Sequence, residues 1–582
     1  MIFKAYKDNP LSEQTDLKQQ LVSFWLHWWP AGFAALVLLV VTADVILRSM
    51  ALNDGLFVYA LDDAYIHMSI ARHLVQDGQW AVSDAGFASA SSSPLWTVMV
   101  AFSYVPFGVN AWTPLAMNIL LGVGVLFAVH DVLRRVAVPG LYSLLVQLAL
   151  IVLLPLNTLI LIGMEHVLQI LVDVLFLGVA ARIICAEDAP GLRSGRWYSL
   201  LILGALVGSA RYEGLFLVLI ACVLLAARWR ILHALTLGLV SIAPVGLFGL
   251  VAIANGWPFL PTSLLVKSDA GYLAQASFEA LLIYFFRDTF EIFANQHVLS
   301  LLVLAALGAY IYRYVQVRAV AAGDKPLTDP WRALWQPPMV MLLLFVMIAF
   351  INVRLVSWPV AGTYARYEAY LIALGLVALA AALGADLPRR FALRVLPVYA
   401  VGMLLLLFVM QDVYGRYRFL AYQNPVVTGT TNIYRQQYQM GRFLRAYYQG
   451  EAVAANDIGA INYLADIHTV DLWGLGTLAV ADARGDNRYS TATIREVTRA
   501  QDAEIAVVYD NWYDAFGGLP PEWVLVGQWQ VRDSVILGSA TVSFFAVEAE
   551  AAASLAANLR DFAPMLPESV IQSGSYLEGR SS

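Results

Sequence analysis

Two adjacent carboxylates, Asp62 and Asp63, stand in the stretch LDDAYIH, shortly after the first long apolar run. Apolar residues recur every four positions behind them, at Ile66, Ile70 and Leu74, which predicts a helix that begins at the acids. One aspartate is enough to cap such a helix. A second charge raises the pKa of its neighbour, and such a carboxylate is suited to take a proton from a hydroxyl. The pair is therefore either a helix cap or a cap that also supplies a general base.

A third acid, Glu165, is expected at the outer end of a later apolar run. A charge this close to hydrocarbon is unfavourable, so a functional site is the first hypothesis and a simple helix cap is the alternative. Arg211 and Glu213 interrupt the apolar stretch 197–227, where two short spans must turn. They are expected either to belong to the same site or to form a local surface ion pair of little energetic value.

The lysines are few. Of the five in the sequence, Lys267 is the one expected on the outer side of the membrane. Basic residues are disfavoured there, so a compensating anion is expected, and a phosphate is a natural partner for an ammonium group. Arg366, followed by Tyr367, adds a second cation at a similar depth. Snorkelling of both cations to lipid headgroups is the alternative.

Taken together, these residues predict one kind of chemistry. Acids suit the activation of a hydroxyl, and cations at headgroup depth suit an anionic lipid. The pattern indicates transfer of a group from a lipid phosphate to an alcohol, in which the cations stabilise the leaving phosphate. The residues concerned are the acids Asp62, Asp63 and Glu165, the cations Arg211, Lys267 and Arg366, and the neighbouring Glu213 and Tyr367.

The composition places these residues in a membrane protein. Hydrophobic residues make up 60% of the 582 positions and charged residues 13%, against roughly 25% charged in soluble domains. The sequence therefore predicts a polytopic α-helical membrane protein, with the lipid bilayer as its surroundings. A net charge of −6 argues against a nucleic-acid partner. Cys185 and Cys222 lie in or beside apolar runs, so no disulfide framework is expected.

About eleven apolar segments are long enough to act as transmembrane helices. Basic clusters occur at alternate connections, which places these connections and the N-terminus in the cytoplasm. The segment Pro94–Phe107 is also apolar, but counting it as a span would move Arg134 and Arg135 outside, so we expect it to lie on the surface or to re-enter. The expected spans are 30–48, 112–133, 139–160, 165–184, 197–210, 212–227, 231–254, 297–316, 338–354, 364–384 and 391–411.

The composition changes after the last span. Residues 1–411 are expected to form the transmembrane domain, with a first outer loop at 49–111, and residues 412–582 a soluble α/β domain outside the membrane. Short β-like runs alternate there with helical stretches. Strands are expected at 452–455, 505–509, 523–526 and 542–547, helices at 438–448 and 459–465, and a disordered tail at 573–582.

The motifs resemble those of a known superfamily. LDDAYIHMSIARHLVQDGQW followed by SASSSPLW resembles the first outer loop of GT-C glycosyltransferases, the multi-span enzymes that use polyprenyl-phosphate sugars, and in particular the AftB-like arabinofuranosyltransferase branch. Tyr212 and Thr262 depart from that pattern, where Pro and Asn are expected, which leaves the sugar open. Further similar blocks are Gly163-Met164-Glu165, Arg211-Tyr212-Glu213-Gly214, Leu260-Pro261-Thr262 with Lys267, Ala365-Arg366-Tyr367, Asn456-Asp457-Ile458-Gly459-Ala460 and Val470-Asp471-Leu472.

The resemblance implies a GT-C membrane core and an inverting transfer, with Asp62 or Asp63 as the base. It implies a polyprenyl-phosphate sugar donor, with arabinofuranose as a candidate sugar, and a cell-envelope glycan acceptor. It also implies a multi-pass protein of the bacterial inner membrane, with the N-terminus cytoplasmic and both the active site and the C-terminal domain extracytoplasmic. The alternatives are the same fold acting on protein or lipid A, and a secondary transporter of an anionic solute, whose charges are expected at the bilayer midplane.

Three features of the sequence each allow two interpretations. No His/Cys cluster has the spacing of zinc ligands, but Asp63 and Glu165 would suit a divalent cation if the fold brings them together. The Ser-rich segment 89–93 is either a flexible loop or a source of hydroxyl contacts to sugar or phosphate. Trp473, Trp512 and Tyr513 are expected in the core of the C-terminal domain, with stacking on an acceptor glycan as the alternative.

Overall fold

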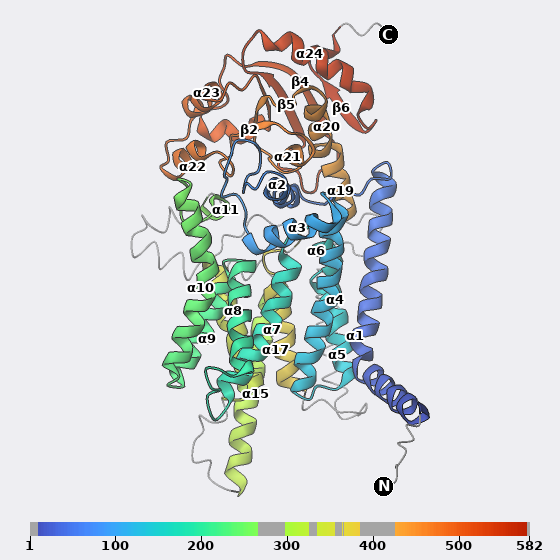
Figure 1. Ribbon diagram of the computed structural model, residues 1–582, viewed down its shortest axis with the longest axis vertical. Helices are drawn as coiled ribbons and strands as arrows, with labels where there is room; N and C mark the ends of the chain where they lie inside the picture. The colour runs from blue at the N-terminus through green and yellow to red at the C-terminus, as the bar shows by residue number, and fades with distance from the viewer. Residues whose placement is uncertain are drawn as a thin grey trace, which may run out of the picture.

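The computed structural model describes residues 10–265, 297–324, 335–355, 364, 366–384 and 425–578. It consists of a long helical bundle, two short helices across one end of the bundle, and a sheet domain beyond them (Figure 1). Five of the described helices are long and apolar enough to cross a membrane, so the chain is a multi-pass membrane protein. The predicted polytopic helical fold with a C-terminal α/β domain is confirmed.

The bundle follows the predicted apolar segments closely, with one difference. The segment expected as a single span at 139–160 forms two helices, α5 and α6, because Pro155 has no backbone N–H to continue the first. The expected span at 391–411 lies outside the described residues. The bundle helices are α1 (Pro10–Leu52), α4 (Trp112–Arg135), α5 (Gly140–Leu153), α6 (Leu156–Leu161), α7 (His166–Cys185), α8 (Gly195–Ala210), α9 (Gly214–Ala227), α10 (Ile231–Ala254), α15 (His297–Asp324), α16 (Pro337–Leu355) and α17 (Ala369–Gly384).

Helix α3 (Pro94–Phe107) lies across the end of the bundle and does not run along it, as the charge pattern predicts (Figure 1). One of its faces, with Trp96, Val100 and Tyr104, is buried. The other face is apolar but exposed, and Phe107 keeps 73% of its surface accessible. An exposed apolar face at the end of a membrane bundle is typical of a helix that lies in the lipid interface.

The sheet domain has six strands in the order β2-β1-β3-β5-β4-β6, parallel from β2 to β3 and antiparallel beyond. Its strands are β1 (Ala452–Ala455), β2 (His468–Asp471), β3 (Ile505–Val508), β4 (Val524–Val531), β5 (Thr541–Ala546) and β6 (Val570–Ser573). Its helices are α19 (Pro425–Arg435), α20 (Gln437–Tyr447), α21 (Ala460–Leu464), α22 (Leu478–Gly485), α23 (Thr491–Ala500) and α24 (Ala551–Phe562), with 3-10 turns η4 (Asp510–Phe516), η5 (Ala563–Met565) and η6 (Ser575–Leu577).

Alternation along the central strands sends side chains to two separate cores. On β3, Ile505 and Val507 pack with α20 and α24, whereas Ala506 and Val508 pack with α22 and α23. The sheet is therefore covered on both faces, which explains why these strands read as continuous apolar runs. The expected disorder of 573–582 is wrong for its first residues, because Tyr576 is fully buried in the first core.

The two domains meet on helix α2 (Asp63–Gln76), which lies directly beneath the sheet domain (Figure 1). The predicted apolar stripe of α2 faces this seam, where Ile66 and Ile70 pack with Ile458 and Leu475 of the sheet domain. A second joint connects α19 to α1, where the Tyr434 hydroxyl donates to Asp54 at 2.7 Å. Helix α2 therefore belongs to both domains at once.

The position of α3 gives a prediction about membrane topology. In a background with Cys185→Ser and Cys222→Ser, single cysteines at Asp84→Cys and Asn110→Cys should react with a membrane-impermeant maleimide from the same side, because α3 between them does not cross. Arg193→Cys should react only from the opposite side. Labelling of the cysteines at 84 and 110 from opposite sides would mean that α3 spans the membrane.

Candidate active site

Asp62 does not cap its own helix. Its two carboxylate oxygens accept hydrogen bonds from the backbone N–H groups of Gly459 and Ala460, each at 2.8 Å. These are the first amides of α21, in the sheet domain, so the acid caps a helix of the other domain. The approach is so close that a Cβ at position 459 would come within 2.5 Å of Oδ2 of Asp62. Only glycine fits there.

A second buried acid stands beside this cap. Burial, together with the nearby charge of Asp457, raises the pKa of Asp62 to about 8, against the lowering effect of the two backbone N–H groups. Burial also raises the pKa of Asp457, although the Tyr509 hydroxyl donates to it at 2.6 Å and Gln437 at 2.9 Å. Asp62 therefore favours its protonated form at neutral pH, and both of its oxygens are already used by the sheet domain.

Asp63 has different surroundings. Its Oδ2 accepts a hydrogen bond from Nη1 of Arg366 at 2.9 Å. The side chain of Asp63 is 28% exposed, whereas that of Arg366 is 8% exposed. The pair therefore consists of a buried cation that orients a carboxylate on the rim of the site. Both adjacent acids are half-buried, but both oxygens of Asp62 already accept hydrogen bonds from the sheet domain, so Asp63 is the better placed of the two to meet an incoming molecule.

Tyr367 connects the two predicted arginines. Its ring lies 4.9 Å from the guanidinium carbon of Arg366 and 5.4 Å from that of Arg211. Nη1 of Arg366 also contacts the sulfur of Met164 at 3.3 Å. Residues from three distant parts of the sequence thus form one cationic and aromatic wall.

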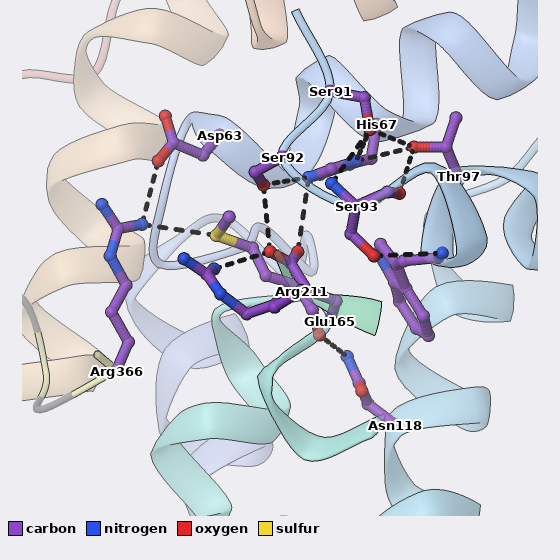
Figure 2. Close-up of polar contacts among 12 residues, drawn as sticks. Asp63, His67, Ser91, Ser92, Ser93, Thr97, Asn118, Glu165, Arg211 and Arg366 are labelled. Carbon is purple, nitrogen blue, oxygen red and sulfur yellow. Dashed lines mark hydrogen bonds and ion pairs between the residues drawn. The ribbon is translucent and has the colours of Figure 1, made fainter. Parts of the chain in front are cut away.

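Glu165 is a buried hub and not a rim residue (Figure 2). It accepts from Nη1 of Arg211 at 2.7 Å and from the Ser92 hydroxyl at 2.9 Å, and Nε2 of His67 lies 3.4 Å from its second oxygen. Burial alone would raise its pKa, but the charges of Arg211, His67 and His166 together outweigh burial and lower the pKa to about 2. The ionised Glu165 holds Arg211 in place, and Arg211 also donates to Glu213.

The Ser-rich segment is ordered by this hub. The Ser93 hydroxyl caps α3 by accepting from the N–H of Trp96 at 3.2 Å. The Ser91 hydroxyl lies 3.0 Å from that of Thr97, which in turn contacts Nδ1 of His67 at 2.8 Å. These hydroxyls position protein groups, which is neither of the two roles considered from the sequence. The sequence reasoning missed His67, although it lies one helical turn after Asp63 on the same face.

The turn before Glu165 depends on one glycine. Gly163 has φ +72°, and a Cβ there would meet the ring of Tyr59 at 2.4 Å. The side-chain amide of Asn118 donates to the backbone carbonyl of Met164 at 3.1 Å, which holds the backbone in place just before Glu165 (Figure 2). The turn thereby presents Met164 and Glu165 to the two arginines.

Two buried side chains at this site have polar atoms without a partner among the described residues. Neither ring nitrogen of His166 has one, and the same holds for Nε of Arg366. The His166 ring lies 6.2 Å from that of Tyr367. Buried polar groups are normally hydrogen-bonded, so these atoms indicate a place where a polar ligand completes the site.

A cation site between Asp63 and Glu165 does not form. Each carboxylate is paired with its own arginine, and Figure 2 shows the two facing different partners. Within the ranges that the structure describes, no group of three His, Cys, Asp or Glu side chains is arranged to hold a metal. The acids of this site are used for hydrogen bonding to protein groups.

The remaining predicted residues are accounted for as follows. Lys267 lies outside the described residues. The Thr262 hydroxyl donates to the carbonyls of Ser89 and Leu475, so it joins the first loop to the sheet domain. Trp473 and Trp512 pack against each other with ring centroids 4.5 Å apart, and Tyr513 is fully buried. These aromatics are part of the packing within the sheet domain.

Comparison with known proteins gives the following. A family model described as Domain of unknown function (DUF8728) matches residues 431–545, and no curated protein matches the sequence. Among solved structures, the chain is similar to ArnT from Cupriavidus metallidurans bound to undecaprenyl phosphate, with 14% identity, coverage of 88% of this chain and 98% of that chain, and a TM-score of 0.47.

It is also similar to the Archaeoglobus fulgidus oligosaccharyltransferase in complex with zinc and sulfate, with 12% identity, coverage of 91% and 74%, and a TM-score of 0.44. For the arabinofuranosyltransferase AftD from Mycobacteria the identity is 14%, the coverage 88% and 41%, and the TM-score 0.41. At these values the assignment of function rests on the chain's own residues.

The interdomain cap is testable by hydrogen exchange. Asp62→Ala should speed exchange of the amides at 459 and 460 by about tenfold or more, because buried N–H groups that lose their acceptor are left unsatisfied. Asp54→Ala, which removes the other joint with Tyr434, should leave these two amides protected. Equal protection in the wild type and in Asp62→Ala would show that the acid does not hold the domains together.

Proposed function

We propose that the protein is a GT-C membrane glycosyltransferase that moves a sugar from a polyprenyl-phosphate donor to a hydroxyl of an extracytoplasmic cell-envelope glycan. The observation that carries the proposal is the rim pair of Asp63 and Arg366, next to buried polar atoms that have no partner in the part of the chain that the structure describes. A reachable carboxylate held against a buried guanidinium is the combination that a hydroxyl nucleophile and a phosphate leaving group require.

The reaction follows from this pair. The acceptor oxygen attacks the anomeric carbon of the donor sugar, the bond from that carbon to the phosphate oxygen breaks, and the phosphate leaves with the electron pair. Asp63 takes the proton of the acceptor hydroxyl, so attack from the side opposite to the phosphate inverts the anomeric centre. Once protonated, Asp63 no longer neutralises Arg366. The guanidinium then becomes available to the leaving phosphate as its negative charge increases.

The charge count at the site supports a role for Lys267. The described cluster contains two cations, Arg211 and Arg366, and three acids, Asp63, Glu165 and Glu213. An additional phosphate would leave this cluster with excess negative charge. Lys267 is the outer lysine that the sequence offers as compensation, so we propose that it contacts the donor phosphate, with Tyr367 packing beside it.

A polar cavity at the seam between the domains supports a glycan acceptor. Its volume is about 390 Å³, and it is lined by Arg72, Gln76, Gln79, Ser83 and Asp466 among others. Arg72 is paired with Asp466 at 2.7 Å, and the two further acids of the lining, Asp77 and Asp84, lie 2.8 Å from His73 and 3.2 Å from His468. Paired groups with amides and a hydroxyl beside them suit a polyhydroxylated ligand, and the cavity lies at the C-terminal end of α2, the helix that begins at Asp63.

The finer assignments are part of the same proposal. Arabinofuranose as the sugar and the AftB-like branch rest on the sequence blocks around Asp62, Glu165 and Lys267. The bacterial inner membrane, a cytoplasmic N-terminus and an extracytoplasmic sheet domain rest on the distribution of basic residues. Protein hydroxyls and lipid A are the competing acceptors, because the seam cavity specifies a polar ligand and not a particular one.

One observation favours the transporter alternative. Asp173 lies near the middle of α7 and is fully buried, and neither of its oxygens has a partner among the described residues. A transporter is expected to collect several charges at this depth, from repeated broken helices. The described acids and arginines of the site collect instead at the end of the bundle beneath the sheet domain.

The proposal predicts different outcomes for the two adjacent acids. Asp63→Asn should lower transfer from polyprenyl-phosphate sugars by about 10² to 10⁴-fold, as expected for loss of a general base, with donor affinity retained or raised because Arg366 is then no longer neutralised. The measurement is single-turnover transfer to short glycans by purified protein in nanodiscs. Asp44→Asn, an exposed acid on α1 paired with Arg48, is the matched control and should retain full activity. Wild-type turnover in Asp63→Asn would exclude this residue as the base.

The role of Lys267 is tested on donor binding. Lys267→Ala should weaken donor affinity by about tenfold or more, because a charge-assisted hydrogen bond to the phosphate is lost. Lys267→Arg should retain most of the affinity, and Lys325→Ala, on a predicted inner loop, should be neutral. An unchanged donor affinity in Lys267→Ala would count against the phosphate contact, whatever the effect on turnover.

A further inference from the structure

The opposite end of the bundle contains a second cavity, far from Asp63. It has a volume of about 510 Å³ and lies between the C-terminal ends of α4 and α7 and the beginning of α8. Three arginines from these elements line it: Arg135, Arg182 and Arg196. The connection between α7 and α8 closes one side through Asp188 and Pro190.

The charges around this cavity are unbalanced. Arg135 is neutralised by Asp131, at 2.5 Å. Arg182 uses its Nε to donate to the carbonyl of Gly178, and neither it nor Arg196 is paired with an acid among the described residues. Arg135 and Arg196 repel Arg182, whereas Asp131 attracts it, and Asp188 is a further acid in the lining, so the arginines outnumber the acids by three to two. Like charges held around one cavity repel each other, and an anion bound between them removes that repulsion.

The cavity wall is held in place by the protein. Arg230 donates to the carbonyl of Ile183 at 2.6 Å, Arg228 donates to the carbonyl of Ala186 at 3.1 Å, and the His233 ring lies 2.9 Å from the carbonyl of Pro190. These bonds from the start of α10 and the residues before it fix the connection between α7 and α8. The three arginines therefore surround a preformed space.

Apolar side chains lie in the cavity lining and on the helix beside it, and together they form its apolar rim. Val179 and Ile183 line the cavity, and Ile202, three residues after the lining Ser199 on α8, is 60% exposed. They stand at the end of a bundle whose helices cross the membrane. The apolar side chains suit the acyl chains of a lipid, and the cationic cavity beside them suits an anionic headgroup. One lipid molecule would provide both.

We propose that this cavity binds the phosphate of an anionic membrane lipid in the leaflet at that end of the bundle. Arg182 and Arg196 contact the phosphate oxygens, while the apolar rim packs against the first part of the acyl chains. This site is independent of the proposed transferase site, which lies at the other end of the bundle. The shared chemistry is a phosphate group, and the rim favours a lipid over free phosphate as its source.

Native mass spectrometry of the full-length protein tests the proposal, with phosphatidylglycerol and phosphatidylcholine as the two probes. The wild type should retain phosphatidylglycerol in preference to phosphatidylcholine. The double variant Arg182→Gln/Arg196→Gln should lower the affinity for phosphatidylglycerol by about tenfold or more, as expected for the loss of two arginines at a headgroup. The double variant Arg134→Gln/Arg193→Gln removes equal charge at the same end but outside the cavity lining, and should bind as the wild type does.

Three outcomes would overturn the proposal. Equal losses of phosphatidylglycerol affinity in the two double variants would mean a diffuse surface attraction. Equal retention of the two lipids would mean that the headgroup is not recognised. Displacement of phosphatidylglycerol by equimolar inorganic phosphate would mean that the site binds free phosphate. If the cavity double variant does not fold, Arg196→Gln alone carries the test, because Arg196 is exposed. Asp63→Asn should leave lipid retention unchanged, which separates this site from the transferase.

Discussion

The contact on which the arrangement of the whole molecule depends is the one between the carboxylate of Asp62 and the amides of Gly459 and Ala460. It joins a loop that emerges from the first transmembrane helix to a domain almost four hundred residues later, and it does so on the helix that presents Asp63. The apolar contacts of Ile66 and Ile70 with the sheet domain also hold α2 against that domain. The position of the reachable acid is thus set by both domains, and neither domain defines the site alone.

The acids of the site divide into two groups by their partners. Both oxygens of Asp62 accept from backbone amides and the buried Glu165 accepts from Arg211 and Ser92, so these two acids define the shape of the site. Asp63 is the carboxylate on the rim, and its partner Arg366 is buried. Since a buried charge without a partner is strongly unfavourable, each of the two buried arginines of the site is accompanied by an acid. A ligand that brings a further negative charge must therefore change these pairs, and this is the basis of the proposed coupling between protonation of Asp63 and release of Arg366.

Much of the fold was predictable from the sequence because hydrophobic length and period are local properties. The long helices, the position of α3 and four of the six strands follow from them, whereas β2 and β6, which are no shorter than β1 and β3, carry too many polar residues to stand out. Most charged residues of the site could be predicted, because a charged residue in an apolar stretch of sequence stands out. The hydrogen-bond partners of these residues could not be predicted. Asp62 accepts hydrogen bonds from two amides far away in the sequence, and Glu165 is contacted by Ser92 and His67. These are tertiary contacts, which no local sequence pattern encodes.

Helix α3 contacts the protein with one face and exposes the other, and this affects how the site is placed relative to the membrane. The face with Trp96 and Tyr104 packs into the protein, and the segment just before it supplies the serines that hold Glu165, while Phe102 and Phe107 point outward. The same short helix therefore fixes the height of the site relative to the lipid headgroups. A lipid-linked substrate would present its phosphate at this level whatever the length of its hydrocarbon tail, so selection among carriers would depend on the headgroup region and not on the number of isoprene units.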